Sequence, residues 1–377
     1  MKFLHISDLH LGKYLNGVSL INDQEYIFKQ IFDIVKSNGI NVVLIAGDIY
    51  DRSIPPVEAT ELLSHILCEF SELKLPVYIV GGNHDGLERL SFGSEIFQND
   101  NIFIAKPYDG TIQKETLFDE FGEINIYLMP FVTTAQIKSS LNIEAKNLTE
   151  AFQIAMDNAN VDTSKRNILV SHQFVTKSKD EMEFFSDHLG GTQNIDANIF
   201  SDTFDYIALG HIHKPYWVIK NKIRYSGSPL KYNIKEHLNT NSITIIEFKH
   251  KGSITFEEIA LKPIRNLRQI IGKFNDIIEK AINTDDYVEI TITDEEYIPD
   301  CLNRLRKVYP NIVKLSFDNS SIKSIEVSNS SAVNVESKST FELFKDFYSL
   351  VYNQNIEDNP NYLRIIQEVA TQIDAEE

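Results

Sequence analysis

Residues 1–12 read MKFLHISDLHLG, and this stretch decides the fold class. Its apolar run from Lys2 to Ile6 predicts a buried strand, which leads into Asp8 and His10. Helical patterns at residues 23–37 and 57–73 then alternate with further apolar runs at residues 42–46 and 76–80. This strand–helix–strand order with short connections predicts a sheet covered by helices on its outer face.

Polar residues follow each predicted strand. Gly47-Asp48 follows the second apolar run, and Gly81-Gly82-Asn83-His84-Asp85 follows the third. Strand candidates at residues 167–170 and 205–209 run into Ser171-His172 and Gly210-His211-Ile212-His213. Because ligand sites in such sheets lie outside the carboxyl ends of the strands, we expect these clusters to lie side by side.

Short strand-like runs dominate the remainder of the main domain. They predict a second sheet packed face to face on the first, with helices outside, so the fold class is α/β. These runs cover residues 124–129, 217–219, 223–226, 242–248 and 253–259.

The charge balance limits how this chain can bind nucleic acid. Its 377 residues contain 36 Lys plus Arg against 54 Asp plus Glu, a formal net charge of -18. A broad phosphate-binding face needs clustered Lys and Arg. The composition therefore argues against such a face and favours a local site, metal ions or a partner protein.

Cysteine usage and the N-terminal sequence favour a reducing cytoplasm. Cys68 and Cys301 lie far apart and form no CxxC spacing, so neither a disulfide framework nor a zinc ribbon is expected. Asp8 and two histidines interrupt the first ten residues, so the apolar core of a signal peptide is missing. No apolar run is long enough for a membrane span. We expect a cytoplasmic protein without membrane contact.

Pro263 marks a predicted domain boundary. We expect a main domain over residues 1–262, a small α+β module over 263–318, a linker over 319–339 and a helical tail over 340–377. In the small module, helical patterns at residues 267–282 and 299–308 alternate with strands at residues 287–292 and 312–317.

The tail predicts two short amphipathic helices separated by Asn359-Pro360. Their apolar faces can pack on this chain's own body or on another protein, and the pattern leaves both alternatives open. The apolar positions are Phe341, Phe344, Phe347, Tyr348, Val351, Leu363, Ile366, Val369, Ala370 and Ile373.

Together the polar clusters supply the donors that a pair of divalent metal ions needs: carboxylates, imidazoles and an amide. Each cluster taken alone is weak evidence for a metal site. An Asp-x-His sequence is more often a capped turn, and a lone His is more often a core or loop residue. Five clusters in order, each after an apolar run, are improbable by chance. We expect alternation in extended segments to bring residues two apart to one side. The candidate ligands are Asp8, His10, Asp48, Asn83, His172, His211 and His213.

This ordered set resembles the motifs of the calcineurin-like metallophosphoesterases. The motifs are D-x-H, G-D-x-x-D, G-N-H-D, S-H and G-H-x-H, which begin at residues 8, 47, 82, 171 and 210. Within this family the chain is most similar to the nuclease subunits of bacterial SbcC–SbcD complexes, with RYSGSP at residues 224–229 as a further shared point. The resemblance implies a four-layer αββα sandwich with a small α+β capping domain and a C-terminal helical tail.

The resemblance also implies two divalent metal ions, with Mn2+ as the working metal. It assigns Asp8, His10, Asp48 and His213 to the first ion, and Asp48, Asn83, His172 and His211 to the second, so that Asp48 bridges them. It makes His84 the general acid or the cation that stabilises the transition state.

Two further carboxylates have expected roles near His84. Asp51 would hold His84 in the right tautomer, although archaeal relatives have a histidine there and Asp51 can instead cap the turn before Pro55-Pro56. For Asp85 we expect a structural role as the cap of the following helix.

By resemblance, the function is that of an Mn-dependent DNA nuclease in DNA repair, replication and recombination. It would act as a 3′–5′ exonuclease on double strands and an endonuclease on single strands and hairpins. Its tail, residues 341–373, would bind an SbcC-type ATPase subunit in a nucleoid-associated complex. A homodimer within a heterotetramer is expected, formed by residues 57–70 or 87–97. The backbone of DNA can be contacted by Lys13, Arg52, Arg89, Lys214 and Lys231, for which solvated surface is the alternative interpretation.

Two other functions remain open. A stand-alone phosphomonoesterase or cyclic-nucleotide phosphodiesterase would use the same core, but it has no evident need of the extra module and the tail. A non-catalytic scaffold would be expected to have lost ligands, whereas all seven ligand positions and His84 are present.

Overall fold

The computed structural model describes residues 1–178, 180–182, 193–200, 203–282 and 284–319, and in the tail residues 341, 342, 344, 345, 348, 356–358, 360, 362–367 and 369. The chain divides into two compact units, Met1–Asn266 and Leu267–Glu377.

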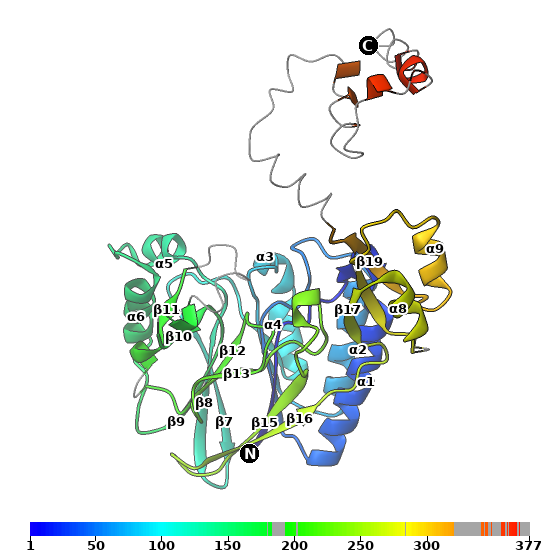
Figure 1. Ribbon diagram of the computed structural model, residues 1–377. Helices are drawn as coiled ribbons and strands as arrows, with labels where there is room; N and C mark the ends of the chain where they lie inside the picture. Colours follow the sequence, from blue (N-terminus) through cyan, green and yellow to red (C-terminus); the bar gives the residue numbers. More distant parts are fainter. Residues whose placement is uncertain are drawn as a thin grey trace. The chain divides into compact units, whose positions relative to one another are not determined.

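The first unit is built on two six-stranded sheets (Figure 1). Apolar residues from the facing sides of both sheets, including Phe3, Leu44 and Ile168, form one continuous core between them. In order across the first sheet the strands are β16 (Ile254–Ala260), β15 (Ser242–Phe248), β1 (Lys2–Ile6), β4 (Val42–Ala46), β5 (Val77–Val80) and β6 (Ile102–Ile104). Across the second they are β13 (Tyr216–Ile219), β14 (Ile223–Tyr225), β12 (Tyr206–Gly210), β9 (Arg166–His172), β8 (Gly122–Met129) and β7 (Gln113–Asp119).

Helices cover both outer faces, which gives the predicted four-layer αββα sandwich (Figure 1). Helices α1 (Ile21–Asn38) and α2 (Val57–Glu72) lie on the side of the first sheet. Helices α5 (Thr134–Leu141) and α6 (Leu148–Asn158) pack on the second sheet through a second apolar core that includes Phe152 and Leu169. Each helix buries one apolar side and exposes the other, as expected for a covering layer.

The connections carry shorter elements. They are β2 (Tyr14–Leu15), β3 (Val18–Ser19), α3 (Leu87–Leu90), α4 (Ser94–Phe97), β10 (Val175–Thr176), β11 (Ile195–Asp196) and the 3-10 helices η1 (Gln98–Asp100), η2 (Ala197–Phe200) and η3 (Ile234–Glu236). Strands β1, β4, β5 and β6 are parallel, as are β8, β9, β12 and β14, so in each set the carboxyl ends share one edge.

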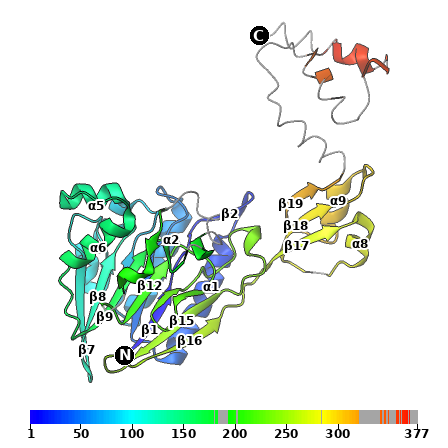
Figure 2. The ribbon, with the colours of Figure 1, turned by 60° about the vertical axis from the view of Figure 1, so that its left-hand side comes forward.

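The second unit contains a parallel three-stranded sheet with the order β17 (Leu267–Gly272), β18 (Tyr287–Ile292) and β19 (Ile312–Phe317) (Figure 2). Helices α8 (Phe274–Glu279) and α9 (Cys301–Arg306) pack on it around Val288, Ile290 and Leu305. The helix predicted over residues 267–282 is therefore wrong in its first part. Residues 267–272 pair with β18 along their whole length, and the helix begins only at Phe274, after its N-cap Lys273.

The predicted linker, residues 319–339, lies outside the described residues except for Asn319. The tail is described at some positions, among them the helical residues 362–367, and at the short 3-10 helix η5 (Ile356–Asp358). The remaining positions of the expected tail helices, including Phe347, Val351, Ala370 and Ile373, lie outside the described residues. Within the described part of the chain, no helix combines the length and the apolar character that crossing a membrane requires.

Candidate metal centre

The structure brings all seven candidate ligands to the edge of the two sheets where the parallel strands end. Three groups of side chains each bring their ligand atoms within 4.8 Å of one another. These groups are Asp8 with His10 and His213, His10 with Asp48 and His84, and Asp8 with Asp48 and His172. The amide oxygen of Asn83 joins them, because it lies 3.1 Å from His172 Nε2 and 2.9 Å from His211 Nδ1.

Several ligands lie in turns with unusual backbone geometry. Asp8, His10, Asp48 and His211 have positive φ angles of 53°, 43°, 48° and 101°, a region that non-glycine residues rarely adopt. Such backbone strain concentrates at functional sites, where the surrounding structure holds it in place. Alternation along an extended strand was therefore the wrong explanation for the D-x-H and H-x-H spacings, because the strands end at Ile6 and Gly210.

Two glycines allow the loops of the site to approach one another. A Cβ atom on Gly210 would lie 1.8 Å from the carbonyl oxygen of Ala46, across the gap between the two sheets. One on Gly82 would lie 2.1 Å from a carboxylate oxygen of Asp48. Any larger residue would force these loops apart, so both positions require glycine for packing reasons.

Backbone hydrogen bonds then fix the ligand loops to each other. Asp8 N–H donates to Gly47 O at 3.0 Å, and His10 N–H donates to Asp48 O at 2.9 Å. The carboxylate of Asp8 accepts the backbone N–H of His211 at 2.8 Å, which links the two sheets. The site is thus held by the scaffold before any ligand binds, as a catalytic constellation requires.

The electrostatics of the buried site couple one carboxylate to several imidazoles. Burial alone would raise the pKa of Asp48, but His172 and His10 nearby bring this pKa well below its ordinary value. Burial and the charge of His172 lower the pKa of His211 to about 3. Burial lowers the pKa of His172, but the nearby carboxylate of Asp48 outweighs burial and raises this pKa to about 9. Carboxylates and imidazoles gathered in this way are ligands that divalent cations bind.

Converging lone pairs show that the residues fit metal ions. His172 Nδ1 lies 2.9 Å from the carbonyl oxygen of Ala46, which can only accept, so a neutral His172 keeps its lone pair on Nε2. That nitrogen faces two further acceptors, Asp48 Oδ2 at 3.3 Å and Asn83 Oδ1 at 3.1 Å. Either a proton on Nε2 or a metal ion has to lie between these atoms, and a carboxylate, an amide oxygen and an imidazole together are ligands that a divalent cation binds.

Two imidazole nitrogens approach each other on the other side of Asp48. His213 Nε2 lies 3.0 Å from His10 Nε2, and His10 Nε2 lies 3.5 Å from Asp48 Oδ2. In addition, Nε2 of His211 is buried without a hydrogen-bond partner among the described residues. Buried polar atoms in native proteins almost always have partners, so this arrangement fits bound ions.

Comparison with protein families identifies the chain. The family model for calcineurin-like phosphoesterases matches residues 1–215, more than half of the chain. The SbcD subunit of the nuclease SbcCD from Staphylococcus epidermidis is 31% identical over 371 residues, which cover 94% of this chain and 95% of that protein. The chain belongs to the calcineurin-like phosphoesterases, in the branch of the SbcD nuclease subunits.

Other similarities concern the C-terminal part and the fold. A family model for the SbcD C-terminal domain, described as the type 5 capsule protein repressor C-terminal domain, matches residues 262–352. Among solved structures, a dimetal phosphatase from Danio rerio is 10% identical, covers 69% of this chain and 96% of its own, and has a TM-score of 0.38. The protein TT1561 of Thermus thermophilus is 8% identical, covers 68% and 98%, and has a TM-score of 0.37.

In this phosphoesterase, divalent metal ions are therefore the expected cofactors, and the donor set described above suits them. When bound, such ions polarise the phosphate and make a water molecule a stronger nucleophile.

The Asp51 carboxylate does not hold His84 as expected. His84 Nδ1 donates to the backbone carbonyl oxygen of Asp51 at 2.9 Å. The carboxylate of Asp51 instead pairs with Lys13 Nζ at 2.7 Å and lies 3.5 Å from His10 Nδ1. Burial opposes its ionisation, but His10 and Lys13 lower the pKa of Asp51 to about 2.

The predicted helix cap at Asp85 is also wrong, although its role is structural. The following helix α3 has Gly86 as its N-cap and no side-chain cap. Asp85 instead accepts the backbone N–H groups of Ile49 at 3.0 Å, Tyr50 at 2.9 Å and Gly82 at 2.8 Å. It thus joins the two loops that carry Asp48 and Asn83, and burial together with Asp48 raises its pKa to about 6.

Sequence reasoning missed two residues that support the ligands. Glu236 contacts His213 Nδ1 at 2.8 Å, and the ring of Tyr232 lies against His10 with centroids 5.2 Å apart. Neither residue lies in an apolar run. The one signal in the sequence that could have indicated them is their position shortly after RYSGSP. Of the predicted DNA contacts, Lys13 pairs with Asp51, and Lys231 bonds the carbonyl oxygen of His237 and the side chain of Asn266.

Proposed function

We propose that this chain is the nuclease subunit of an ATP-dependent complex of the SbcC–SbcD type, working in DNA repair, replication and recombination in the cytoplasm. The observation that carries the proposal is the complete ligand cluster with an exposed His84 beside it, in a chain that matches a nuclease subunit over 94% of its length. We infer 3′–5′ exonuclease activity on double strands and endonuclease activity on single strands and hairpins.

Each predicted ligand has a role in this proposal. Asp8, His10, Asp48 and His213 would hold the first ion, and Asp48, Asn83, His172 and His211 the second. Asp48 suits the shared position because its carboxylate lies between His10, at 3.5 Å, and His172, at 3.3 Å. We propose Mn2+ as the metal, since imidazole ligands suit it better than Mg2+, which favours oxygen donors.

His84 is the proposed catalytic acid. Its Nδ1–H is held by Asp51 O, so Nε2 is the nitrogen that can exchange a proton with the leaving oxygen. Its ring lies against that of His10, with centroids 4.9 Å apart, and its side chain is exposed at the mouth of the site. Protonation of the leaving oxygen completes phosphodiester hydrolysis without a covalent intermediate.

The net charge and the C-terminal tail support an ATPase subunit as the partner and DNA as the substrate. A net charge of -18 leaves little basic surface for DNA, so the ATPase subunit would supply most of it. We propose that the tail, residues 341–373, binds that subunit. The alternative, a stand-alone phosphodiesterase or phosphatase on the same fold, would give an active chain with no need of the tail.

Cleavage assays on the purified chain test the nuclease proposal. Linear duplex and single-stranded DNA are incubated with Mn2+ and wild type or Asp48→Asn, with bis-p-nitrophenyl phosphate as the small substrate. We expect wild type to cut DNA and the variant to cut neither. Hydrolysis of the small substrate alone, even after the ATPase subunit is added, would favour the stand-alone phosphodiesterase. If wild type with its metal ions bound cuts neither DNA nor the small substrate, the result would favour the non-catalytic scaffold.

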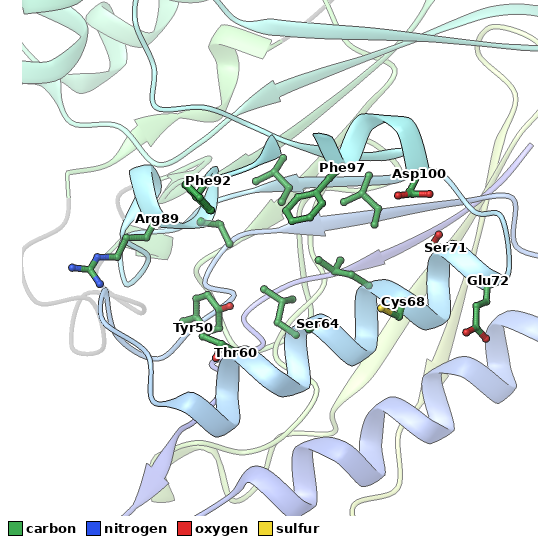
Figure 3. A pocket seen from close by; sticks show the side chains of 15 residues that line it. Tyr50, Thr60, Ser64, Cys68, Ser71, Glu72, Arg89, Phe92, Phe97 and Asp100 are labelled. Atoms are coloured by element: carbon green, nitrogen blue, oxygen red, sulfur yellow. The ribbon is translucent and has the colours of Figure 1, made fainter. Parts of the chain in front are cut away.

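We further propose that a second copy of the chain packs on the groove between α2 and the segment of α3 and α4 (Figure 3). The groove has a volume of about 470 Å³, and its lining includes Leu63, Leu67 and Phe97. Large apolar side chains project beside it, with Phe92 83% and Ile96 69% exposed. Apolar patches of this kind on a folded surface mark protein contacts.

The oligomeric state tests this interface. Multi-angle light scattering should give a dimer for wild type and a monomer for Phe92→Ser. Phe118→Ser is the matched control, because Phe118 is 70% exposed on β7 and far from the groove in sequence. A dimer that survives Phe92→Ser and Ile96→Ser together would place the interface elsewhere.

A further inference from the structure

Glu236 is a buried carboxylate beside the proposed metal site that the seven ligands leave unexplained. It ends the short helix η3, and it is 9% exposed. We propose that Glu236 is a positioning residue: it holds the ligand His213 in its metal-binding tautomer and strengthens binding of the first ion. The inference rests on the proposed two-metal site and extends the set of residues that build it.

Both oxygens of Glu236 are used. Oε1 lies 2.8 Å from His213 Nδ1, and Oε2 accepts the backbone N–H of Tyr232 at 2.8 Å. Asn233 caps the turn, since its side chain accepts the N–H of Lys235 at 3.0 Å. The carboxylate is therefore fixed by its own segment before it meets His213, which makes it a rigid support.

This contact decides which nitrogen of His213 faces the metal site. An ionised carboxylate can only accept, so His213 Nδ1 carries the proton and Nε2 presents its lone pair. Nε2 is the nitrogen that lies 3.0 Å from His10 Nε2, on the side of the ligand cluster. A carboxylate on the far nitrogen also makes an imidazole a stronger metal ligand.

The other imidazole ligands lack this support. The far nitrogen of His172 bonds a backbone carbonyl, Ala46 O at 2.9 Å. His10 Nδ1 lies 3.5 Å from Asp51 Oδ1 and has no hydrogen-bond partner within the described part of the chain. Compared with His10 and His172, His213 is the imidazole whose far nitrogen is hydrogen-bonded to a carboxylate, so the effect should fall on the first ion.

Tyr232 strengthens the same support from the same segment. Its ring lies edge-on to those of His10 and His213, with centroids 5.2 Å and 5.8 Å apart. Its hydroxyl bonds the carbonyl oxygen of Leu9, next to His10. The segment from Tyr232 to Glu236 thus packs against both imidazoles assigned to the first ion.

The test is calorimetric titration of Mn2+ into wild type and Glu236→Gln. The amide of glutamine keeps the shape but has one acceptor, so it cannot satisfy both His213 and Tyr232. We expect one of the two Mn2+ sites to weaken by about 10- to 100-fold and the other to stay unchanged. Glu257→Gln, an exposed glutamate on β16, is the matched control and should bind like wild type. Two unchanged affinities in Glu236→Gln would overturn the proposal.

A second measurement does not depend on the variant folding. In Zn2+-loaded wild type labelled with 15N-histidine, NMR should show His213 protonated on Nδ1, and an Nε2–H form would overturn the proposal. The two proposals fail separately. Wild type that binds two Mn2+ ions but cuts no DNA contradicts the nuclease function and leaves the role of Glu236 intact, whereas active wild type with an unaffected Glu236→Gln contradicts only the latter.

Discussion

His84 Nδ1 lies 2.9 Å from the backbone carbonyl oxygen of Asp51. The backbone N–H of His84 also donates to Asp48 Oδ1 at 2.9 Å. The carbonyl oxygen of Asp51 thus orients the ring of His84. The backbone N–H of His84 is hydrogen-bonded to Asp48, whose carboxylate is proposed to bridge the ions. This geometry separates proton transfer from metal binding, because His84 contributes its side chain to one and its backbone to the other.

Replacing His84 should therefore remove catalysis and leave the metal site in place. We expect His84→Gln to lower kcat for DNA cleavage by about 10²- to 10⁴-fold, the usual contribution of a general acid. Its Mn2+ affinities, measured by calorimetry, should match those of wild type. A variant that loses its metal ions would instead make His84 part of the metal site.

Asp51→Asn should have a much smaller effect. Its carbonyl oxygen, which orients His84, is unchanged by the substitution, and only the contacts to Lys13 and His10 are altered. We expect kcat to fall by less than about ten-fold, since a general acid that keeps its orientation keeps most of its contribution. A loss as large as that of His84→Gln, in assays run side by side, would restore a catalytic role to the carboxylate.

The grouping of the ligands could be predicted from the sequence, because each follows an apolar run and parallel strands end at one edge. What could not be predicted depends on how separate loops meet. Asp85, after β5, bonds backbone N–H groups of the loop after β4, and the carboxylate of Asp51 in that loop contacts Lys13 and His10 in the loop after β1. No local pattern encodes such a contact.

Element prediction failed where burial is not continuous. Strand β7 alternates half-buried and exposed residues at the sheet edge and so forms no apolar run, and β6 is only three residues long. In the second unit, Leu267, Ile270, Ile271, Phe274 and Ile277 have helical spacing, but pairing with β18 overrides it for residues 267–272. Pairing with a neighbouring strand therefore outweighed the local helical pattern, and the segment is a strand.

Asp85 predicts a measurable stability effect. It is 8% exposed and accepts three backbone N–H groups, whereas an asparagine has one acceptor and would place its N–H₂ against a donor. We expect Asp85→Asn to lower the free energy of unfolding by about 1–3 kcal/mol. Urea titrations in EDTA measure this without a metal contribution. Asp33→Asn, at an exposed position of α1, is the control, and equal midpoints for both variants would contradict the role given to Asp85.

Arg265 and Asp23 provide the last test, at the end of the first unit. Arg265 Nε and Nη2 bond the two carboxylate oxygens of Asp23 at 3.0 Å and 2.7 Å. Asp23 is 1% exposed on α1, one residue before Gln24, whose side-chain amide bonds His10 O at 2.7 Å. Arg265→Met keeps the aliphatic stem but removes both bonds from a buried charge.

We expect Arg265→Met to lower the free energy of unfolding by about 2–3 kcal/mol, below the full cost of breaking a buried pair because the arginine is partly exposed. Asp23→Asn combined with Arg265→Met should recover part of this loss, since it removes the buried charge as well. Urea unfolding of wild type, Arg265→Met, Asp23→Asn and the double variant in one buffer gives the coupling energy directly. If the double variant is no more stable than Arg265→Met, the loss comes from packing of the arginine stem and not from the ion pair.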